Sequence, residues 1–292
     1  MRSLVGSLRR ALLGACLVSV LGCEAPVERR VSYDERFDRT EMDLYLPDDG
    51  SAGRPGILTV HGGAWAYSSN RSYRSIARRF ARSGYVVANM NYRLVPEGVF
   101  PNAVHDVACA LAWLQNHAEE LGLDPTRIAV MGYSAGAHLA TLVSVQDDPM
   151  LQPDCAEGPP LRPAAIVSGA GPMDMRGLRD ARLVREFMGG REEDIPERYA
   201  LASPVEHASA EDPPTLFVHG RWDLFVPVSQ SRDMRDRLRA VGVEANVLEL
   251  AGSGHVINAN DDASSLGIAL SNDSPETWAT ILGFLDRHIG EP

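Results

Sequence analysis

The sequence predicts an α/β protein with a mainly parallel central sheet and helices on both of its faces. From about residue 40 to residue 290, short apolar runs alternate with amphipathic stretches, and no internal repeat, low-complexity tract or linker divides that span. Parallel strands need long crossover connections, which are usually helical, so this alternation favours a parallel sheet. We therefore expect one domain over residues 40–290, with its ligand site at the carboxyl ends of the strands.

The individual elements follow from the same pattern. Apolar runs predict strands over residues 42–46, 57–60, 86–90, 128–131, 164–167, 215–218 and 246–250. Amphipathic periodicity predicts helices over residues 73–81, 101–120, 135–145, 229–241 and 275–289. The stretch 171–212 is longer than a connection needs, so we expect a small lid or pocket wall above the sheet.

Charge excludes several functions. The 292-residue chain has 28 basic and 39 acidic residues, a formal net charge of −11. Nucleic-acid binding uses clustered positive charge, so we expect no nucleic-acid partner. All 28 basic residues are Arg, and the absence of Lys excludes phosphate loops, Schiff bases and Ser-Lys dyads that depend on it.

The first 22 residues resemble a signal peptide. Arg2, Arg9 and Arg10 precede an uncharged stretch, 11–22, that is too short to span a bilayer. Residues 20–23 (VLGC) resemble the lipobox of bacterial lipoproteins, which implies lipidation of Cys23. The alternative is an ordinary secretory signal with a chance Cys. Either reading predicts export, and lipidation of Cys23 implies anchoring in the bacterial cell envelope, on the periplasmic or cell-surface side.

A polar tether, residues 23–39, follows this signal. Removing residues 1–22 takes away three Arg and no acidic residue, which changes the net charge from −11 to −14. An acidic domain is repelled by anionic lipid, so we expect membrane contact through the lipid anchor only. Two cysteines remain, Cys109 and Cys155, as a disulfide or as two free thiols. The chain has no CxxC or Cys/His ligand spacing, so we expect no metal.

A nucleophile motif follows the predicted strand 128–131. Gly132-Tyr133-Ser134-Ala135-Gly136 is a G-x-S-x-G pattern, and a helix-favouring segment comes directly after it. Glycines on both sides of the Ser permit the tight strand-to-helix turn that exposes its hydroxyl. We therefore expect Ser134 to be a catalytic nucleophile.

A second Gly-rich turn follows the predicted strand 57–60. It reads His61-Gly62-Gly63-Ala64-Trp65. Backbone N–H groups on such a turn can stabilise the oxyanion of an acyl-transfer intermediate. We assign this oxyanion hole to Gly63 and Ala64, with Gly62 permitting the turn, and to the N–H of Ala135.

With these motifs the chain resembles the α/β-hydrolase superfamily, in particular its hormone-sensitive-lipase-like and bacterial feruloyl/acetyl esterase branch, which includes kynurenine formamidases. The resemblance covers about residues 40–290. It rests on MDLYLP, HGGAW, NYRLVPE, GYSAGAH, the Trp222-Asp223 turn and Gly254-His255. Many members have a third glycine where this chain has Ala64. The alanine keeps the backbone N–H donor but narrows the pocket.

The acid and the base of such an enzyme follow the Ser in the chain order Ser, Asp, His. Asp223 lies in a loop after the predicted strand 215–218, and His255 lies in a Gly-rich loop after the predicted strand 246–250. The resemblance implies that Asp223 is the acid and His255 the base. Asp174 is the best alternative acid.

The remaining polar residues near these motifs have structural interpretations. We expect His138 to be packed and hydrogen-bonded beneath the nucleophile turn, and His61 and His219 to be structural residues at strand ends. Asp106 is expected to be solvated or ion-paired on the face of a helix.

The sequence thus predicts a serine carboxylesterase without a cofactor, acting on short-acyl esters that are small molecules or are carried on a polymer. An arylformamidase or other amidase could use the same triad. A surface-binding lipoprotein without catalysis is the alternative of another class, but it would not need an oxyanion hole. Fold alone does not choose among substrates.

Overall fold

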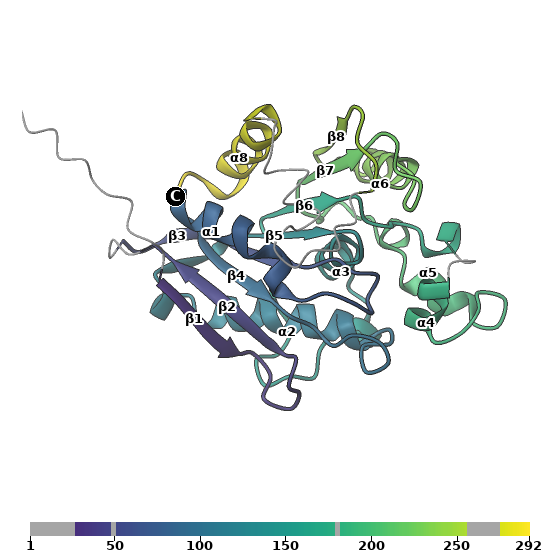
Figure 1. The fold of residues 1–292 in the computed structure, drawn as a ribbon, viewed down its shortest axis with the longest axis horizontal. Coiled ribbons are helices and arrows are strands. Elements are labelled where there is room, and N and C mark those ends of the chain that lie inside the picture. Colours follow the sequence, from purple (N-terminus) through teal and green to yellow (C-terminus); the bar gives the residue numbers. More distant parts are fainter. Residues whose placement is uncertain (1–26, 48–50, 179–181, 256–274) are drawn as a thin grey trace, which may run out of the picture.

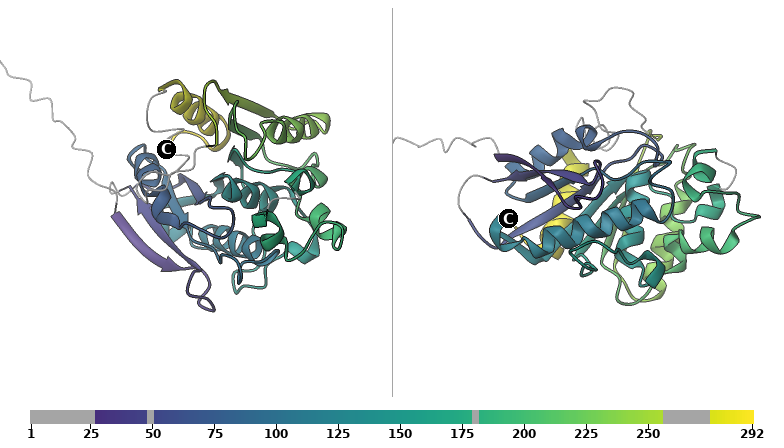
Figure 2. Two further views of the ribbon diagram at one scale, coloured as in Figure 1. Left: turned by 45° about the vertical axis from the view of Figure 1, so that its right-hand side comes forward. Right: turned by 90° about the horizontal axis from the view of Figure 1, so that it is seen from below.

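The computed structural model describes residues 27–47, 51–178, 182–255 and 275–292 (Figure 1). The predicted signal, residues 1–22, and the predicted lipidation site Cys23 lie outside the described residues. In the described part of the chain, eight strands form one sheet in the order β1-β2-β4-β3-β5-β6-β7-β8. Helices cover both faces of this sheet, which confirms the predicted fold class (Figure 2).

The sheet is parallel except at one edge. The strands are β1 (Val27–Ser32), β2 (Glu41–Leu46), β3 (Arg54–Val60), β4 (Val86–Met90), β5 (Leu123–Tyr133), β6 (Ala165–Gly169), β7 (Thr215–Gly220) and β8 (Ala245–Leu250). The pairs β1/β2 and β2/β4 are antiparallel, and all the pairs from β4 to β8 are parallel. The carboxyl ends of β3, β5, β6 and β7 therefore meet at one edge of the sheet.

Side chains that alternate along the strands separate the two faces. Ile57 packs with Phe80 of α1 (Arg74–Arg82) and Phe284 of α8 (Pro275–Ile289). Leu58 joins the core under α2 (Asn102–Asn116) and α3 (Ala135–Val145). Phe217 contributes to a third cluster under α6 (Ser229–Ala240). The 3-10 turns η1 (Asn70–Tyr73), η2 (Glu119–Leu121) and η3 (Pro149–Leu151) complete the connections outside residues 171–212.

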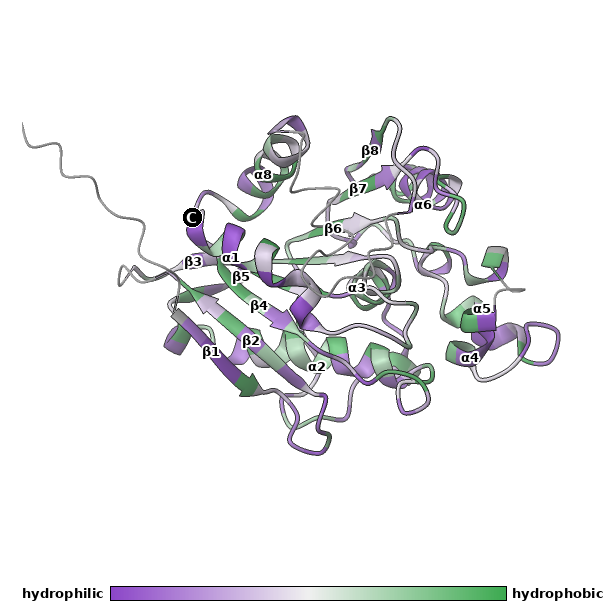
Figure 3. Ribbon diagram, viewed as in Figure 1, coloured by the Kyte–Doolittle hydropathy of each residue, from purple (hydrophilic) through white to green (hydrophobic). Residues whose placement is uncertain are grey.

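The sequence did not predict β1. Six of the residues of the predicted tether form this strand, and most of it is hydrophilic (Figure 3). Its contacts are polar: Arg30 pairs with Asp43 of β2 at 2.7 Å, and Glu28 pairs with Arg78 of α1 at 2.6 Å. An edge strand needs no continuous apolar run, because only one of its sides is paired and much of it faces water.

Residues 171–212 contain η4 (Met175–Leu178), α4 (Arg182–Met188), α5 (Pro196–Leu201) and η5 (Pro204–Glu206). Figure 1 shows α4 and α5 beyond the carboxyl ends of the central strands. Phe187, Met188 and Tyr199 are fully buried in the cluster formed with α2 and α3. This segment is therefore continuous with the core rather than a separate cover.

Cys109 and Cys155 form a disulfide that joins α2 to the loop after η3. The sequence had left this pair open between a disulfide and free thiols. Among the described helices, none has both the length and the apolarity needed to cross a bilayer.

Candidate active site

The nucleophile turn lies between β5 and α3. Ser134 has φ 53° and ψ −124°, a conformation that is strained for a residue with a side chain. A Cβ on Gly132 would lie 2.4 Å from the backbone of Gly136, and a Cβ on Gly136 would lie 2.1 Å from the carbonyl oxygen of Val60. Only glycine fits at these two positions, which explains the spacing of the motif.

Three residues from three loops meet at this turn. The His255 Nε2 lies 3.0 Å from the Ser134 Oγ, and the His255 Nδ1 lies 2.6 Å from the Asp223 Oδ2. A carboxylate can only accept, so Nδ1 carries the proton and Nε2 is free to accept the Ser134 hydroxyl. The structure therefore brings together the three residues that the sequence assigned as nucleophile, base and acid.

The Asp223 carboxylate is held by further donors. Its Oδ1 accepts the backbone N–H groups of Phe225 and Val226, each at 2.9 Å. Its Oδ2 also lies 3.3 Å from the Nε2 of His219. Burial alone would raise the pKa of Asp223, but hydrogen bonds from His219, His255 and the Val226 amide outweigh burial, so this pKa lies well below its usual range. The acid is therefore ionised at neutral pH.

The predicted oxyanion turn lies beside the nucleophile. A Cβ on Gly62 would lie 2.8 Å from the Tyr133 carbonyl oxygen, and a Cβ on Gly63 would lie 2.2 Å from the Tyr67 carbonyl oxygen. Ala64 has φ 52°, a conformation that favours glycine. The alanine that stands in place of the third glycine therefore strains the backbone. The N–H groups of Gly63, Ala64 and Ala135 donate to no other described residue. They are the donors that an oxyanion would need.

The other histidines near these turns are packed, as expected. His138 is fully buried; its Nδ1 accepts the Trp65 Nε1–H at 3.3 Å, and its Nε2 donates to the Ala202 carbonyl at 2.7 Å. Burial lowers the pKa of His138 to about 4. His61 is buried and stacked on Tyr92, and burial lowers its pKa to about 3. Both are neutral at pH 7.

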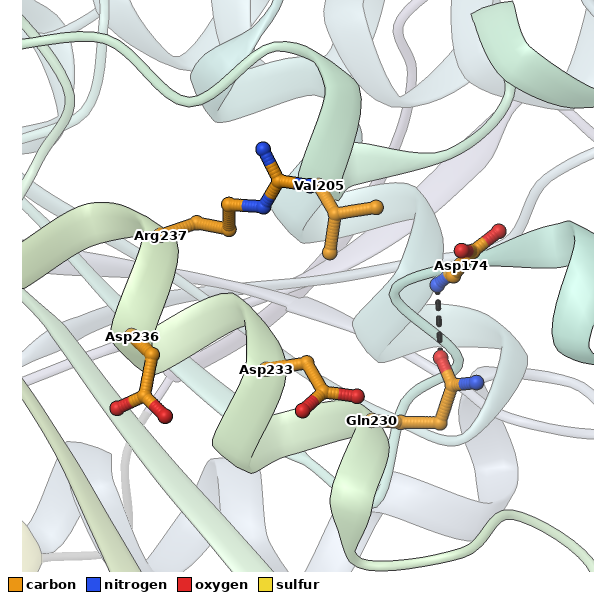
Figure 4. A pocket seen from close by; sticks show the side chains of 6 residues that line it. All are labelled: Asp174, Val205, Gln230, Asp233, Asp236 and Arg237. Carbon is orange, nitrogen blue, oxygen red and sulfur yellow. Dashed lines mark hydrogen bonds between the residues drawn. The ribbon is translucent and has the colours of Figure 1, made fainter. Parts of the chain in front are cut away.

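Asp174, the alternative acid, is directed elsewhere. Its Oδ1 accepts the Arg176 Nε–H at 2.8 Å, and burial, which would raise its pKa, is outweighed by this guanidinium, so the pKa is lowered. Its backbone N–H donates to the Gln230 Oε1 at 2.7 Å (Figure 4). These contacts lie at a cavity of about 430 Å³, which is lined by Asp174, Val205, Gln230, Asp233, Asp236 and Arg237 and by none of the three residues at the nucleophile turn.

Asp106 is ion-paired, but not on a solvated face. It is buried on α2, and its Oδ1 lies 2.6 Å from the Arg93 guanidinium. Burial raises its pKa despite this partner. The pair fixes the segment between β4 and α2 and lies outside the triad.

The contact of His219 with Asp223 is a feature of the site that the sequence did not predict. His219 is buried at the carboxyl end of β7, and sequence analysis assigned it a structural role only. Its position four residues before Asp223 and at a strand end is compatible with a contact to the acid but does not specify one.

A model of the BD-FAE family matches residues 42–238. The probable carboxylic ester hydrolase LipM of Mycobacterium tuberculosis is 33% identical over 86% of this chain, and the chain spans 61% of its length. Among solved structures, a truncated carbohydrate esterase from gut microbiota has a TM-score of 0.77 at 22% identity, with 92% of this chain and 98% of that chain covered.

A second solved structure, Thermogutta terrifontis esterase 2 phosphoramylated by tabun, has a TM-score of 0.69 at 25% identity, with 89% of this chain and 97% of that chain covered. These structures have the same fold as this chain. Because the family model covers most of the sheet and both Gly-rich turns, this chain belongs to the BD-FAE family, within the hormone-sensitive-lipase-like branch of the α/β-hydrolase superfamily.

Proposed function

We propose that this chain is a serine carboxylesterase that hydrolyses short-acyl esters through an acyl-enzyme. The observation that carries the proposal is the hydrogen-bonded series Ser134–His255–Asp223, with distances of 3.0 Å and 2.6 Å, beside backbone N–H groups that donate to no other described residue. Nucleophilic catalysis by Ser needs a base to take its proton and an oriented acid behind that base.

In the acylation half, His255 Nε2 takes the Ser134 proton while Oγ bonds to the ester carbonyl carbon. The carbonyl oxygen becomes an oxyanion, which accepts the N–H groups of Gly63, Ala64 and Ala135. When the intermediate collapses, the C–O bond to the alcohol breaks and the His255 proton passes to the departing alcohol. Asp223 stabilises the protonated imidazole between these two transfers.

In the deacylation half, water replaces the alcohol. His255 takes a proton from the water as its oxygen bonds to the acyl carbon, and the same donors stabilise the second oxyanion. The Ser134–acyl bond then breaks, Ser134 recovers its proton from His255, and the carboxylic acid leaves. Every proton that leaves one group is received by a named one, so the cycle closes without a cofactor.

The comparisons support ester hydrolysis as the reaction. LipM is named a probable carboxylic ester hydrolase, and the neighbour at 25% identity is titled an esterase that tabun phosphoramylates. Organophosphates of this kind react with activated nucleophiles, which Ser134 would be. An arylformamidase would use the same groups, so the assay below includes a formamide.

Packing of residues 171–212 supports short acyl groups. The apolar residues that would have to line a long acyl tunnel pack in the core instead. Met173, Met175, Phe187 and Met188 are fully buried, and the rings of Trp65 and Phe187 are stacked with their centroids 4.5 Å apart. A long acyl chain gains about 0.8 kcal/mol per CH₂ only where it is removed from water. Within the described residues, little apolar surface of this segment is left for that purpose.

We also propose that the protein is exported and anchored through Cys23. The basic start, the uncharged stretch 11–22 and the VLGC sequence support this proposal. The Cys109–Cys155 disulfide adds to it, because disulfides persist in oxidising compartments and are rare in the reducing cytosol.

The direct test is turnover by purified residues 24–292. The protein is offered p-nitrophenyl acetate, butyrate and decanoate, and an arylformamide, at matched concentrations. We expect hydrolysis of the short esters at a kcat/KM above that for the formamide. A higher kcat/KM for the formamide would replace the esterase proposal with an amidase, and no turnover of either class would refute catalysis through this triad.

A further inference from the structure

His219 makes a contact that the proposed mechanism does not use. It is fully buried, and its Nε2 lies 3.3 Å from the same Asp223 oxygen that accepts the His255 Nδ1–H. The same Nε2 lies 2.8 Å from the Val226 carbonyl oxygen, in the turn that carries Asp223. Two imidazoles, one from β7 and one from the loop after β8, thus approach one carboxylate oxygen.

The hydrogen bonds of His219 fix its tautomer. A carbonyl oxygen can only accept, so Nε2 must carry a proton that is shared between Val226 and Asp223. On the other side of the ring, Nδ1 lies 2.7 Å from the hydroxyl oxygen of Ser231, which is buried on α6. With Nδ1 accepting this hydroxyl, His219 presents a single N–H, which bonds to the Val226 carbonyl oxygen with Nε2 2.8 Å from it and also 3.3 Å from the Asp223 Oδ2.

We infer that His219, oriented by Ser231, is a positioning residue for Asp223: it holds the carboxylate toward His255 and takes up part of its negative charge. The inference rests on the proposed function, because it concerns the acid of that same triad. The series of contacts then extends beyond the triad, from Ser134 through His255, Asp223 and His219 to Ser231.

The electrostatic consequence concerns the base. An N–H donor directed at the Asp223 Oδ2 competes with His255 for the charge on that oxygen. Without this donor, Asp223 attracts the protonated form of His255 more strongly, so His255 becomes harder to deprotonate.

Other charged and titratable groups nearby leave this assignment unchanged. Tyr133 of β5 lies with its ring 5.4 Å from the His255 ring and has no formal charge at neutral pH. Glu249 of β8 is opposite His219 in the strand register, but its carboxylate is paired with Arg232 of α6 at 2.8 Å and with Arg221 at 3.3 Å. Because these two guanidinium groups offset its charge, Glu249 contributes little to the electrostatic potential at the Asp223 carboxylate.

The test compares pH profiles of kcat/KM for p-nitrophenyl acetate. His219→Phe keeps a ring but removes the donor, whereas His219→Gln offers an amide N–H near the position of Nε2. The matched control is His138→Phe, which removes a buried imidazole that also has both ring nitrogens bonded but does not touch Asp223. Urea unfolding of each variant measures stability separately.

We expect His219→Phe to move the acid limb of the profile upward by at least about half a pH unit, with kcat on the order of tenfold lower and KM within about twofold. His219→Gln should recover most of both effects, and Ser231→Ala should show a smaller shift in the same direction. His138→Phe should lower stability without moving the acid limb.

An unmoved acid limb in folded His219→Phe would overturn the inference, as would an equal shift in His138→Phe. If His219→Phe does not fold, an unmoved acid limb of the pH profile in Ser231→Ala would overturn the inference instead. These results require an active parent protein, so they are distinct from failure of the proposed function, in which the parent itself turns over no ester.

Discussion

Asp223→Asn removes one charge while keeping the shape of the side chain, and the structure shows why it should be severe. Asp223 receives donors on both oxygens: two backbone N–H groups on Oδ1, and His255 and His219 on Oδ2. An Asn has one accepting oxygen and one donating NH₂. Whichever way it is turned, the NH₂ faces donors that the carboxylate accepted.

If the amide oxygen keeps the two backbone N–H groups, the NH₂ faces His255. The imidazole then accepts at Nδ1 and carries its proton on Nε2, where it cannot take the Ser134 proton. If the amide is turned over, the NH₂ faces the N–H groups of Phe225 and Val226, and the turn itself is disrupted. Both arrangements also lose the charge that stabilises protonated His255.

We expect kcat for p-nitrophenyl acetate to fall by about 10⁴-fold, which corresponds to about 5.5 kcal/mol of transition-state stabilisation. The control is Asp174→Asn, which removes a carboxylate that pairs with Arg176 and does not contact His255. Its kcat should stay within about threefold of the parent value. Stopped assays at pH 7.5 with protein confirmed folded by circular dichroism give both numbers. A folded Asp223→Asn protein with more than about a tenth of the parent kcat, or a larger loss in Asp174→Asn, would refute this assignment of the acid.

Three further predictions concern substrate, anchoring and pH. The kcat/KM for p-nitrophenyl acetate or butyrate should exceed that for the decanoate by at least about tenfold, or about 1.4 kcal/mol; a preference for the decanoate would mean that residues 171–212 shelter a long chain. Full-length protein made in a bacterium should incorporate a labelled fatty acid and partition into detergent, and Cys23→Ser should do neither; labelling that persists in Cys23→Ser would exclude the anchor. Burial lowers the pKa of His138 from its ordinary value of 6.5 to about 4. The contribution of neutral His138 to folding stability should therefore be complete above pH 6.5. It should be lost as the pH falls, because the unfolded chain binds the proton before the folded protein does. Between pH 6.5 and 4 this loss should reach about 3 kcal/mol in urea titrations, and an equal loss in His138→Gln would assign it to other groups.

Local sequence patterns were sufficient for the buried strands and most helices. Residues 86–90 and 135–145 have the predicted bounds, because both segments are buried all round and are therefore mostly apolar, with single polar residues such as Asn89 and His138 between the apolar ones. The predicted helix 101–120 ends earlier, at Asn116, and continues as a short 3-10 turn. β1 was not predictable in this way, since it is held by pairing with the next strand, β2, and by ion pairs rather than by its own apolar residues.

The residues of the candidate site also differ in whether a local sequence pattern or a contact between segments determines their position. Ser134 was found from its glycines, because the tight turn imposes a sequence spacing. Asp223 and His255 were found from the family resemblance, together with their chain order and strand ends. The contact between His219 and Asp223 depends on how the turn to Val226 folds back over β7, and that geometry leaves no spacing rule in the sequence. The burial of Asp106 was missed for a similar reason, since it depends on how the connection between β4 and α2, which carries its partner Arg93, packs over the helix.

The central claim is that Ser134 is the nucleophile of an ester hydrolase, and Ser134→Ala tests it most directly. The Oγ of Ser134 lies 3.0 Å from the His255 base and forms the covalent bond between the enzyme and the acyl group in the proposed cycle. Ser134→Ala should therefore unfold in urea at the parent midpoint while its turnover of p-nitrophenyl acetate falls to less than about a hundredth of the parent rate. A folded Ser134→Ala protein that exceeds that rate would show that another group attacks the ester.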